Sequence, residues 1–466
     1  MKSPMPKTFV PGKPGARDFL LLSGVLLIHL AWALVELLKG PWLVGHSKGF
    51  IAHNFAVPFG YPLFLDAVKL FFHNHSLNVT AGIQVVWVAG LAFYFSFWAK
   101  KLFNLGWAGF LAVDLVALLP FWDDLGLWII PDAAARDITP EPLAYGFVLV
   151  AAVGMAAWII KKSLPHLLAA MACSCLAFAV LPQYVFLVFF SLLLVVLRAR
   201  RIGLFRQTLF PALFLLCCLA GVSLADRAYH LAAYKTFAPG LGGGVQRVTP
   251  LLYLMDPTDT TSAADKQERF FLQLLYEELS KERLLKIYNK PDKLTSFAFH
   301  YRNAYYRIQK KVLPQVFARV FRQGITAWET KESSDLTYQE YVRLNDLTKQ
   351  MAKPLALAHI KDVLWLFGQE CFAGHGLNQY LLVLIWGPWV LCGWLCIKTP
   401  TPRYKALFCL LSLHPAACVF AFWAGPLSAA ALFNSFNLAC ASLVVFLASG
   451  QGENPCSRLG AEGGTS

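Results

Sequence analysis

Residues 19–38 read FLLLSGVLLIHLAWALVELL, a run made almost entirely of apolar side chains. A membrane-spanning α-helix needs about 20 mostly apolar residues, so this run is long enough to cross a bilayer as a single helix. The run is too long for the core of a secretion signal, and no small-residue cleavage site follows it. We therefore expect residues 19–38 to remain in the protein as a membrane anchor.

Apolar runs of similar length recur along the rest of the chain. Apolar residue types make up 57% of the sequence and charged types 15%, whereas soluble domains have about a quarter charged residues. The sequence therefore predicts an all-α, polytopic membrane protein with about ten transmembrane helices. The candidate spans are 19–38, 82–99, 105–122, 143–160, 166–181, 182–197, 206–224, 377–397, 405–423 and 427–449.

The basic residues lie at the ends of these runs, which is the pattern that orients membrane proteins. With about ten spans and a cytoplasmic N-terminus, all the basic clusters fall on the cytoplasmic side. Both termini are then cytoplasmic, and loops 39–81 and 123–142 and segment 225–376 are extracytoplasmic. This placement explains the net charge of +14 without a nucleic-acid partner. The clusters are Lys2, Lys7, Lys13 and Arg17; Lys100 and Lys101; Lys161 and Lys162; Arg198, Arg200, Arg201 and Arg206; and Lys398, Arg403 and Lys405.

Composition divides the chain into four parts. Residues 1–224 form an N-terminal membrane domain with large outward loops, and residues 377–449 form the C-terminal membrane helices. Residues 225–376 are rich in mixed charges, so we expect an extracytoplasmic, mainly helical domain. Its candidate amphipathic helices cover 264–288, 297–322 and 353–372. The polar, glycine-rich tail 450–466 is expected to be disordered.

The first outward loop carries the histidines His46, His53, His73 and His75 and ends in an amphipathic stretch, 60–72, that suits a helix in the membrane interface. Histidines can bind zinc or move protons, but they also serve as interfacial polar residues. His73 and His75 are poorly spaced for joint ligation in a helix. The eleven cysteines show no metal-binding spacing and mostly lie within apolar runs. The residue pattern thus indicates no metal site, and the cofactor is unknown.

Carboxylates near the membrane are the second group of candidate functional residues. Asp123, Asp124 and Asp132 fit a solvated loop. Glu141 differs because it opens a span between two prolines, where the helix N-terminus favours an acid. Asp114 lies inside a span, where a charge is either functional or paired.

Basic residues with aromatic neighbours are concentrated in segment 225–376. The stretch 301–322, which includes Arg302, suits the phosphate groups of lipids, although a solvated helix face fits equally well. Arg227 and Arg247 lie near the start of the segment and are further candidates for holding a phosphate.

Several short segments, in order, resemble the GT-C class of membrane glycosyltransferases, within the superfamily of protein O-mannosyltransferases and aminoarabinose transferases. Gly60-Tyr61-Pro62-Leu63-Phe64-Leu65 is similar to the family's segment after the first outward loop. Ile138-Thr139-Pro140-Glu141-Pro142-Leu143 is similar to its acidic segment. Residues 227–237 resemble the entry to its outer domain, and Pro354 with the following helix resembles the helix before its late spans.

The resemblance implies transfer of a sugar from a polyprenyl-phosphate donor to a lipid, glycan or protein acceptor on the outer face of the bacterial inner membrane. Glu141, His46 and Asp66 are then the candidate catalytic residues. The residues expected to bind phosphate or substrate are Arg227, Arg247, Tyr61 and Arg302.

The chain departs from the family pattern at two positions. His46 stands where the family has an aspartate early in the first loop, and Leu181 stands where the family often has an arginine. The alternative is therefore a non-catalytic relative, or a membrane protein that binds or transports lipid or polysaccharide. A transporter is expected to show inverted repeats and paired charges at the membrane midplane, and no repeat is evident.

Overall fold

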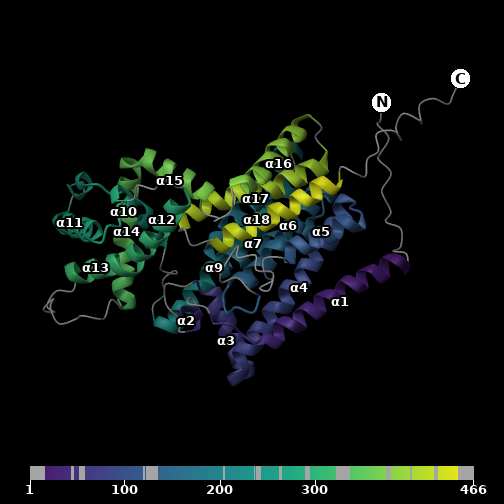
Figure 1. The fold of residues 1–466 in the computed structure, drawn as a ribbon, viewed down its shortest axis with the longest axis horizontal. Coiled ribbons are helices and arrows are strands. Elements are labelled where there is room, and N and C mark those ends of the chain that lie inside the picture. Colours follow the sequence, from purple (N-terminus) through teal and green to yellow (C-terminus); the bar gives the residue numbers. More distant parts are fainter. Residues whose placement is uncertain are drawn as a thin grey trace.

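The computed structural model shows an almost entirely helical chain in two parts, a bundle of apolar helices and a lobe of amphipathic helices at one end of it (Figure 1). The only other regular element in the part of the chain it describes is an isolated β-bridge between Trp42 and Asp137. The residues described are 16–43, 47–51, 58–118, 121, 135–202, 205–235, 237, 243–261, 265–288, 294–321, 336–373, 379–398, 401–424 and 429–449.

Each span expected from the sequence overlaps a helix of the bundle, although the helix found within the span expected at 105–122 covers only residues 107–118. Among the described residues, four stretches are long and apolar enough to cross a membrane, namely Asp18–Lys39, Gly60–Phe103, Glu141–Lys161 and Leu209–Tyr234. The total of about ten spans stays a prediction. The bundle helices are α1 (Ala16–Lys39), α4 (Ser76–Phe103), α5 (Trp107–Leu118), α6 (Glu141–Lys161), α7 (Leu164–Val180), α8 (Val185–Ile202), α9 (Phe205–Tyr234), α16 (Gln379–Lys398), α17 (Pro402–Ala424) and α18 (Ala429–Ser449).

Helix α6 lies at the centre of the bundle. In the most apolar 18-residue stretch of α6, 83% is buried inside the protein, compared with 28% in the same stretch of α1 and 11% in that of α9. It packs against α4, α7, α17 and α18. Two glycines permit this close approach, because an added Cβ would lie 2.0 Å from the Trp87 indole nitrogen at Gly146 and 2.5 Å from the His166 carbonyl oxygen at Gly154. Small residues at helix contacts are the usual way for membrane helices to pack closely.

One end of the bundle collects the ends of α1, α7 and α9 and the start of α6. The bridge between Trp42 and Asp137 joins the segment after α1 to the segment before α6. Gly60, at the start of α3 (Gly60–Phe72), packs on the Ala179 carbonyl near the end of α7. The ring of Phe59 lies 6.4 Å from that of Tyr229 in the last turns of α9. Since the lobe follows α9, this end of the bundle is also the end that carries the lobe.

The opposite end of the bundle collects lysines around half-buried indole rings. Lys100 lies 3.3 Å above the ring of Trp107 and 3.8 Å from Asp18 at the start of α1. Lys101 and Lys161 both lie above Trp98, at 5.2 and 4.8 Å. Positive charge at one end of a bundle of apolar helices is the distribution found on the cytoplasmic side of membrane proteins.

The stretch expected to lie in the membrane interface is the helix α3. It buries Tyr61, Leu65 and Val68 against the bundle and exposes Leu70 and Phe71. The short helix α2 (Ser47–Ile51) precedes it, and the 3₁₀ turn η1 (His73–His75) links it to α4. A helix with one face on protein and a second apolar face exposed suits the boundary between headgroups and acyl chains.

The lobe has a hydrophobic core of its own, separate from that of the bundle. The single helix expected over 264–288 was wrong in its second part, because α11 ends at Lys281 and a turn and a 3₁₀ turn follow it. The range 297–322 corresponds to α12 with its continuation to Phe321. The prediction of a single helix over 353–372 was wrong, because the helix is interrupted at His359, between α14 and α15. The lobe helices are α10 (Gly243–Leu254), α11 (Lys266–Lys281), α12 (Leu294–Arg307), α13 (Leu313–Phe321), α14 (Tyr338–Ala358) and α15 (Ile360–Ala373), with a π turn, Ile308–Val312, between α12 and α13. The 3₁₀ turns are η4 (Pro182–Tyr184) in the bundle and η5 (Pro257–Thr261) and η6 (Lys286–Tyr288) in the lobe.

Ion pairs on the lobe surface join α11 to α13. Arg319 donates a hydrogen bond of 2.9 Å to Glu278, and this bond lowers the pKa of the Glu278 carboxyl. A carboxyl group whose pKa is lowered by folding stabilises the fold at pH values above its pKa in the unfolded chain. This stabilisation is lost as the pH falls through the pKa of the folded state. Because both side chains are partly exposed, the pair contributes little to stability.

The orientation expected from the sequence, with the lysine-rich end in the cytoplasm, predicts which end of the bundle is accessible from outside the cell. In a variant without native cysteines, we expect Lys281→Cys, in the lobe, to react with an impermeant maleimide in intact cells. Ser163→Cys, between α6 and α7 at the lysine-rich end, is expected to react only after the cells are permeabilised. Labelling of Ser163→Cys in intact cells, together with protection of Lys281→Cys, would reverse the orientation.

Candidate active site at the rim of the bundle

Polar side chains gather at the lobe end of the bundle, where α1 ends and α3, α4 and α6 begin. We call this group the rim cluster, and it consists of Glu36, Tyr61, Gln84, Arg136, Asp137 and Glu141. Helices α1, α3, α4 and α6 and the segment before α6 supply these side chains.

Glu36 is the most deeply buried acid of the rim cluster. Its side chain is inaccessible to solvent, although it lies in the last turn of an apolar helix. Lys39, one turn later, donates a hydrogen bond of 2.8 Å to its Oε1. The guanidinium Nε of Arg136 lies 3.6 Å from Oε2. A buried carboxylate needs such partners, because removing an unpaired charge from water is very costly.

The segment before α6 is held against the segment after α1 by backbone hydrogen bonds. The amide of Trp42 donates to the Arg136 carbonyl at 3.2 Å, and the amide of Ile138 donates to the Trp42 carbonyl at 3.1 Å. The Arg136 guanidinium lies 4.8 Å from the centre of the Trp42 ring, a cation–π distance. These contacts bury Arg136 and Asp137, although both come from an outward loop.

Gln84 connects α4 to both α3 and the segment before α6. Its amide nitrogen donates a hydrogen bond of 2.6 Å to the carbonyl of Thr139, and its amide oxygen accepts one of 3.5 Å from the Tyr61 hydroxyl. Tyr61 is fully buried, and the negative charges of Glu141 and Asp137 act on its phenol. One buried hydroxyl therefore lies within the electrostatic reach of two carboxylates.

Glu141 begins α6 directly after Pro140, and its side chain is partly exposed. The free amides of a first helical turn carry partial positive charge, which favours the ionised form of a carboxylate there. The site thus combines a partly exposed carboxylate at a helix start, a buried tyrosine and an arginine. A carboxylate can accept a proton, and an arginine can stabilise a nearby anionic group.

The structure brings together two of the candidate site residues, Tyr61 and Glu141. Asp66 is placed differently, because it lies five positions after Tyr61 on α3 and acts electrostatically on Tyr229 of α9. Arg227 lies in α9 with its guanidinium 5.7 Å from the Phe237 ring. Two further candidates lie in the lobe: Arg247 is exposed on α10, and Arg302 lies in α12 with its side chain not described. His46 falls outside the described residues, as do Asp123, Asp124 and Asp132.

Glu36, Gln84, Arg136 and Asp137 were not identified as site residues from the sequence. A signal for Glu36 existed, since an acid inside an apolar span is unusual and calls for a partner. The partner, Arg136, lies a hundred positions later, and no local pattern connects the two residues.

Asp114 is a paired charge. The Nε2 of His29 in α1 lies 2.7 Å from its Oδ2, and the Nδ1 of His29 lies 2.8 Å from the carbonyl oxygen of Ala89. A carbonyl oxygen only accepts, so Nδ1 carries a proton, and Nε2 faces the carboxylate of Asp114. This pair ties α1 and α5 to α4 inside the bundle.

Three comparisons with known proteins returned no relative. No family model matches the chain, and neither a curated protein nor a solved structure matches it.

The buried pair of Glu36 and Arg136 predicts coupled effects on stability. Arg136→Gln is expected to lower the free energy of unfolding in detergent by about 3 kcal/mol, because Glu36 is left buried with Lys39 as its cation. In the double variant Glu36→Gln/Arg136→Gln, the loss should be smaller than the sum of the two single losses by at least about 1 kcal/mol.

Unfolding followed by tryptophan fluorescence measures these differences. Lys281→Gln, a change at a lysine whose side chain is 75% exposed, serves as the control and should leave stability unchanged. Strict additivity of the two rim substitutions would show that Glu36 and Arg136 do not stabilise each other.

Proposed function

We propose that this protein is a membrane glycosyltransferase of the GT-C type. It moves a sugar from a polyprenyl-phosphate donor to a lipid, glycan or protein acceptor on the extracytoplasmic face of the cell inner membrane, with both termini cytoplasmic. The observation that supports the proposal most is the placement of Asp137 and Glu141 around Tyr61 at the lobe end of the bundle.

The position of the rim cluster suits a donor whose phosphate lies at the membrane surface. The cluster lies where α1 ends and α4 and α6 begin, which is the level of lipid headgroups if these helices span the bilayer. The neighbouring helices α1 and α9 expose long apolar faces, which can lie beside a polyprenyl chain. The links between helices at the lysine-rich end are short, such as residues 104–106 and 162–163, and offer no room for a nucleotide-binding domain.

The chemistry assigned to the rim is a displacement at the anomeric carbon. The carboxylate of Glu141 takes the proton of the acceptor hydroxyl while the oxygen forms a bond to the anomeric carbon. The bond from that carbon to the donor's phosphate oxygen breaks, and polyprenyl phosphate leaves with the electron pair, so the configuration inverts. Arg136 at the rim and Arg227 in α9 supply positive charge for the leaving phosphate.

Transfer by the purified protein in lipid nanodiscs tests this proposal. A polyprenyl-phosphate sugar with a radioactive sugar should label membrane acceptors, and a nucleotide sugar alone should not. Glu141→Gln is expected to lower the rate by about 100-fold or more, because the amide cannot accept the proton.

Asp66→Asn is the matched comparison, since it removes a second carboxylate from the same end of the bundle. A large loss at Asp66 with normal transfer in Glu141→Gln would move the base to the contact between α3 and α9. If the unaltered protein transfers no sugar from any polyprenyl-phosphate donor, the proposal is wrong and the non-catalytic alternative is supported.

A further inference from the structure

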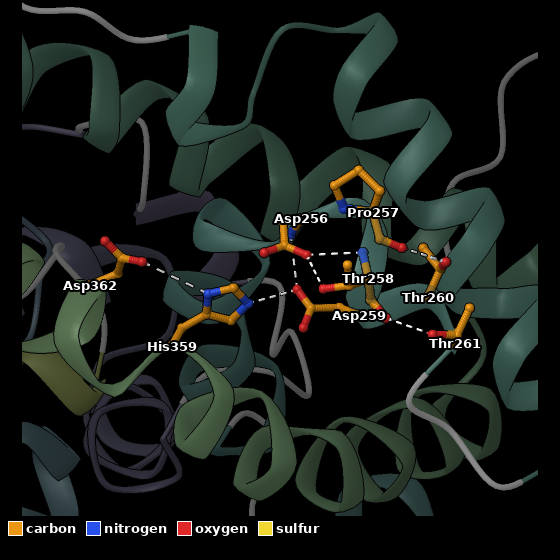
Figure 2. A network of polar contacts seen from close by, with 8 residues as sticks. All are labelled: Asp256, Pro257, Thr258, Asp259, Thr260, Thr261, His359 and Asp362. Carbon is orange, nitrogen blue, oxygen red and sulfur yellow. Dashed lines mark hydrogen bonds and ion pairs between the residues drawn. The ribbon is translucent and has the colours of Figure 1, made fainter.

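A compact group of carboxylates and one imidazole lies in the lobe, separate from the rim cluster (Figure 2). Asp256 and Asp259 come from the turn that follows α10, and His359 comes from the break between α14 and α15. One potential ligand atom from each of these residues lies within 4.8 Å of the other two. Segments about a hundred positions apart in the chain thus meet at three side chains of metal-ligating types.

The imidazole of His359 is buried and directed at the two aspartates. Its exposed fraction is 7%, and that of Asp259 is 4%. Nε2 lies 2.6 Å from the Oδ2 of Asp259. Asp256 is the exposed member of the group and opens it to solvent.

Surrounding residues hold each of these three side chains in place. The amide and hydroxyl of Thr258 both donate hydrogen bonds to the Oδ1 of Asp256, and the amide of Asp256 donates to the Oδ2 of Asp259 at 2.9 Å. Figure 2 shows Asp362 on the opposite side of the His359 ring, where its Oδ2 lies 3.9 Å from Nδ1.

Asp362 is itself fixed by Lys286, which binds its Oδ1 and lies 4.3 Å above the Trp365 ring. A carboxylate on the Nδ1 side of an imidazole favours the proton on Nδ1 and leaves Nε2 free to bind a metal, and at 3.9 Å Asp362 acts through its charge and not through a hydrogen bond. This arrangement is an observation independent of the two aspartates, and it indicates that Nε2 is the ligating nitrogen.

We propose that Asp256, Asp259 and His359 bind one divalent transition-metal ion, for which Zn²⁺ is the best fit. A nitrogen ligand beside two carboxylates favours Zn²⁺ over Mg²⁺ and Ca²⁺, which prefer oxygen ligands throughout. Three protein ligands leave one position of a tetrahedral ion open, and the exposure of Asp256 places that position at the solvent. The ion therefore carries an exchangeable water or an anionic ligand.

Binding replaces the contact between His359 and Asp259 by two bonds to the ion. His359 binds the ion through Nε2 as a neutral imidazole with its proton on Nδ1, on the side of Asp362, and a proton held between Nε2 and Asp259 is released to solvent. Two negative charges then meet a doubly positive ion, so the group becomes neutral. The ion also joins the turn after α10 to the break before α15, and α15 packs against α17 of the bundle.

The full-length protein in detergent, stripped with a chelator and free of affinity tags, provides the test. With ZnCl₂ as the only added metal, we expect about one tightly bound ion per chain by mass spectrometry after dialysis, together with a raised midpoint of thermal unfolding. Asp256→Asn and His359→Gln are each expected to weaken Zn²⁺ binding by more than about 100-fold, and Thr258→Val by about tenfold. Co²⁺ in place of Zn²⁺ should give a visible absorption spectrum that these ligand variants lose.

Two controls separate this site from other metal-binding residues. Asp346→Asn removes an exposed carboxylate elsewhere in the lobe, and the double variant His73→Gln/His75→Gln removes the exposed histidines between α3 and α4. Both should bind Zn²⁺ as the unaltered protein does. The proposal is overturned if the unaltered protein retains no Zn²⁺, or if Asp256→Asn and His359→Gln, folded by their unfolding curves, retain it fully.

Discussion

The burial of α6 is the constraint on which the rest of the bundle depends. This helix has no polar face, and lipid could surround its apolar side chains as well as protein does, so its central position depends on close packing against α4, α7, α17 and α18. Gly146 and Gly154 let an indole ring and a neighbouring backbone approach its axis. Because α6 is fixed on all sides, its first residue, Glu141, is fixed as well. The rim cluster is therefore attached to the most buried of the four described stretches that are long and apolar enough to cross a membrane.

The rim cluster combines structural and chemical roles in neighbouring side chains. Glu36, Lys39 and Arg136 form a buried charged group that joins the end of α1 to the segment before α6. Asp137, the next residue of that segment, and Glu141, the first residue of α6, both act on Tyr61. A buried ion pair often contributes little net stability compared with apolar side chains of the same size. The role that we infer for the pair of Glu36 and Arg136 is to hold the neighbouring carboxylates, Asp137 and Glu141, in position.

The sequence predicted the helices well because each of them depends on local pattern. Apolar runs located the bundle helices, and the stretch 60–72 was recognised as amphipathic with the bounds that α3 has. Pairs of charged residues that lie far apart in the sequence could not be predicted from local patterns. Nothing near Asp114 indicates that His29 is its partner, and Glu36 meets Arg136 only because the segment after α1 pairs with the segment before α6. The break at His359 was missed because the helical pattern continues on both sides of it.

The central claim is that the rim cluster, and not the lobe, meets the phosphate of a polyprenyl-phosphate donor. A donor analogue with a photoreactive group next to its phosphate, activated in nanodiscs that contain the purified protein, tests this claim most directly. Mass spectrometry of the digested protein should locate the label in residues 36–43, 58–66 and 135–143, and excess unlabelled donor should remove it. Label confined to the lobe helices α10–α15, or to α16–α18 at the other side of the bundle, would contradict the account.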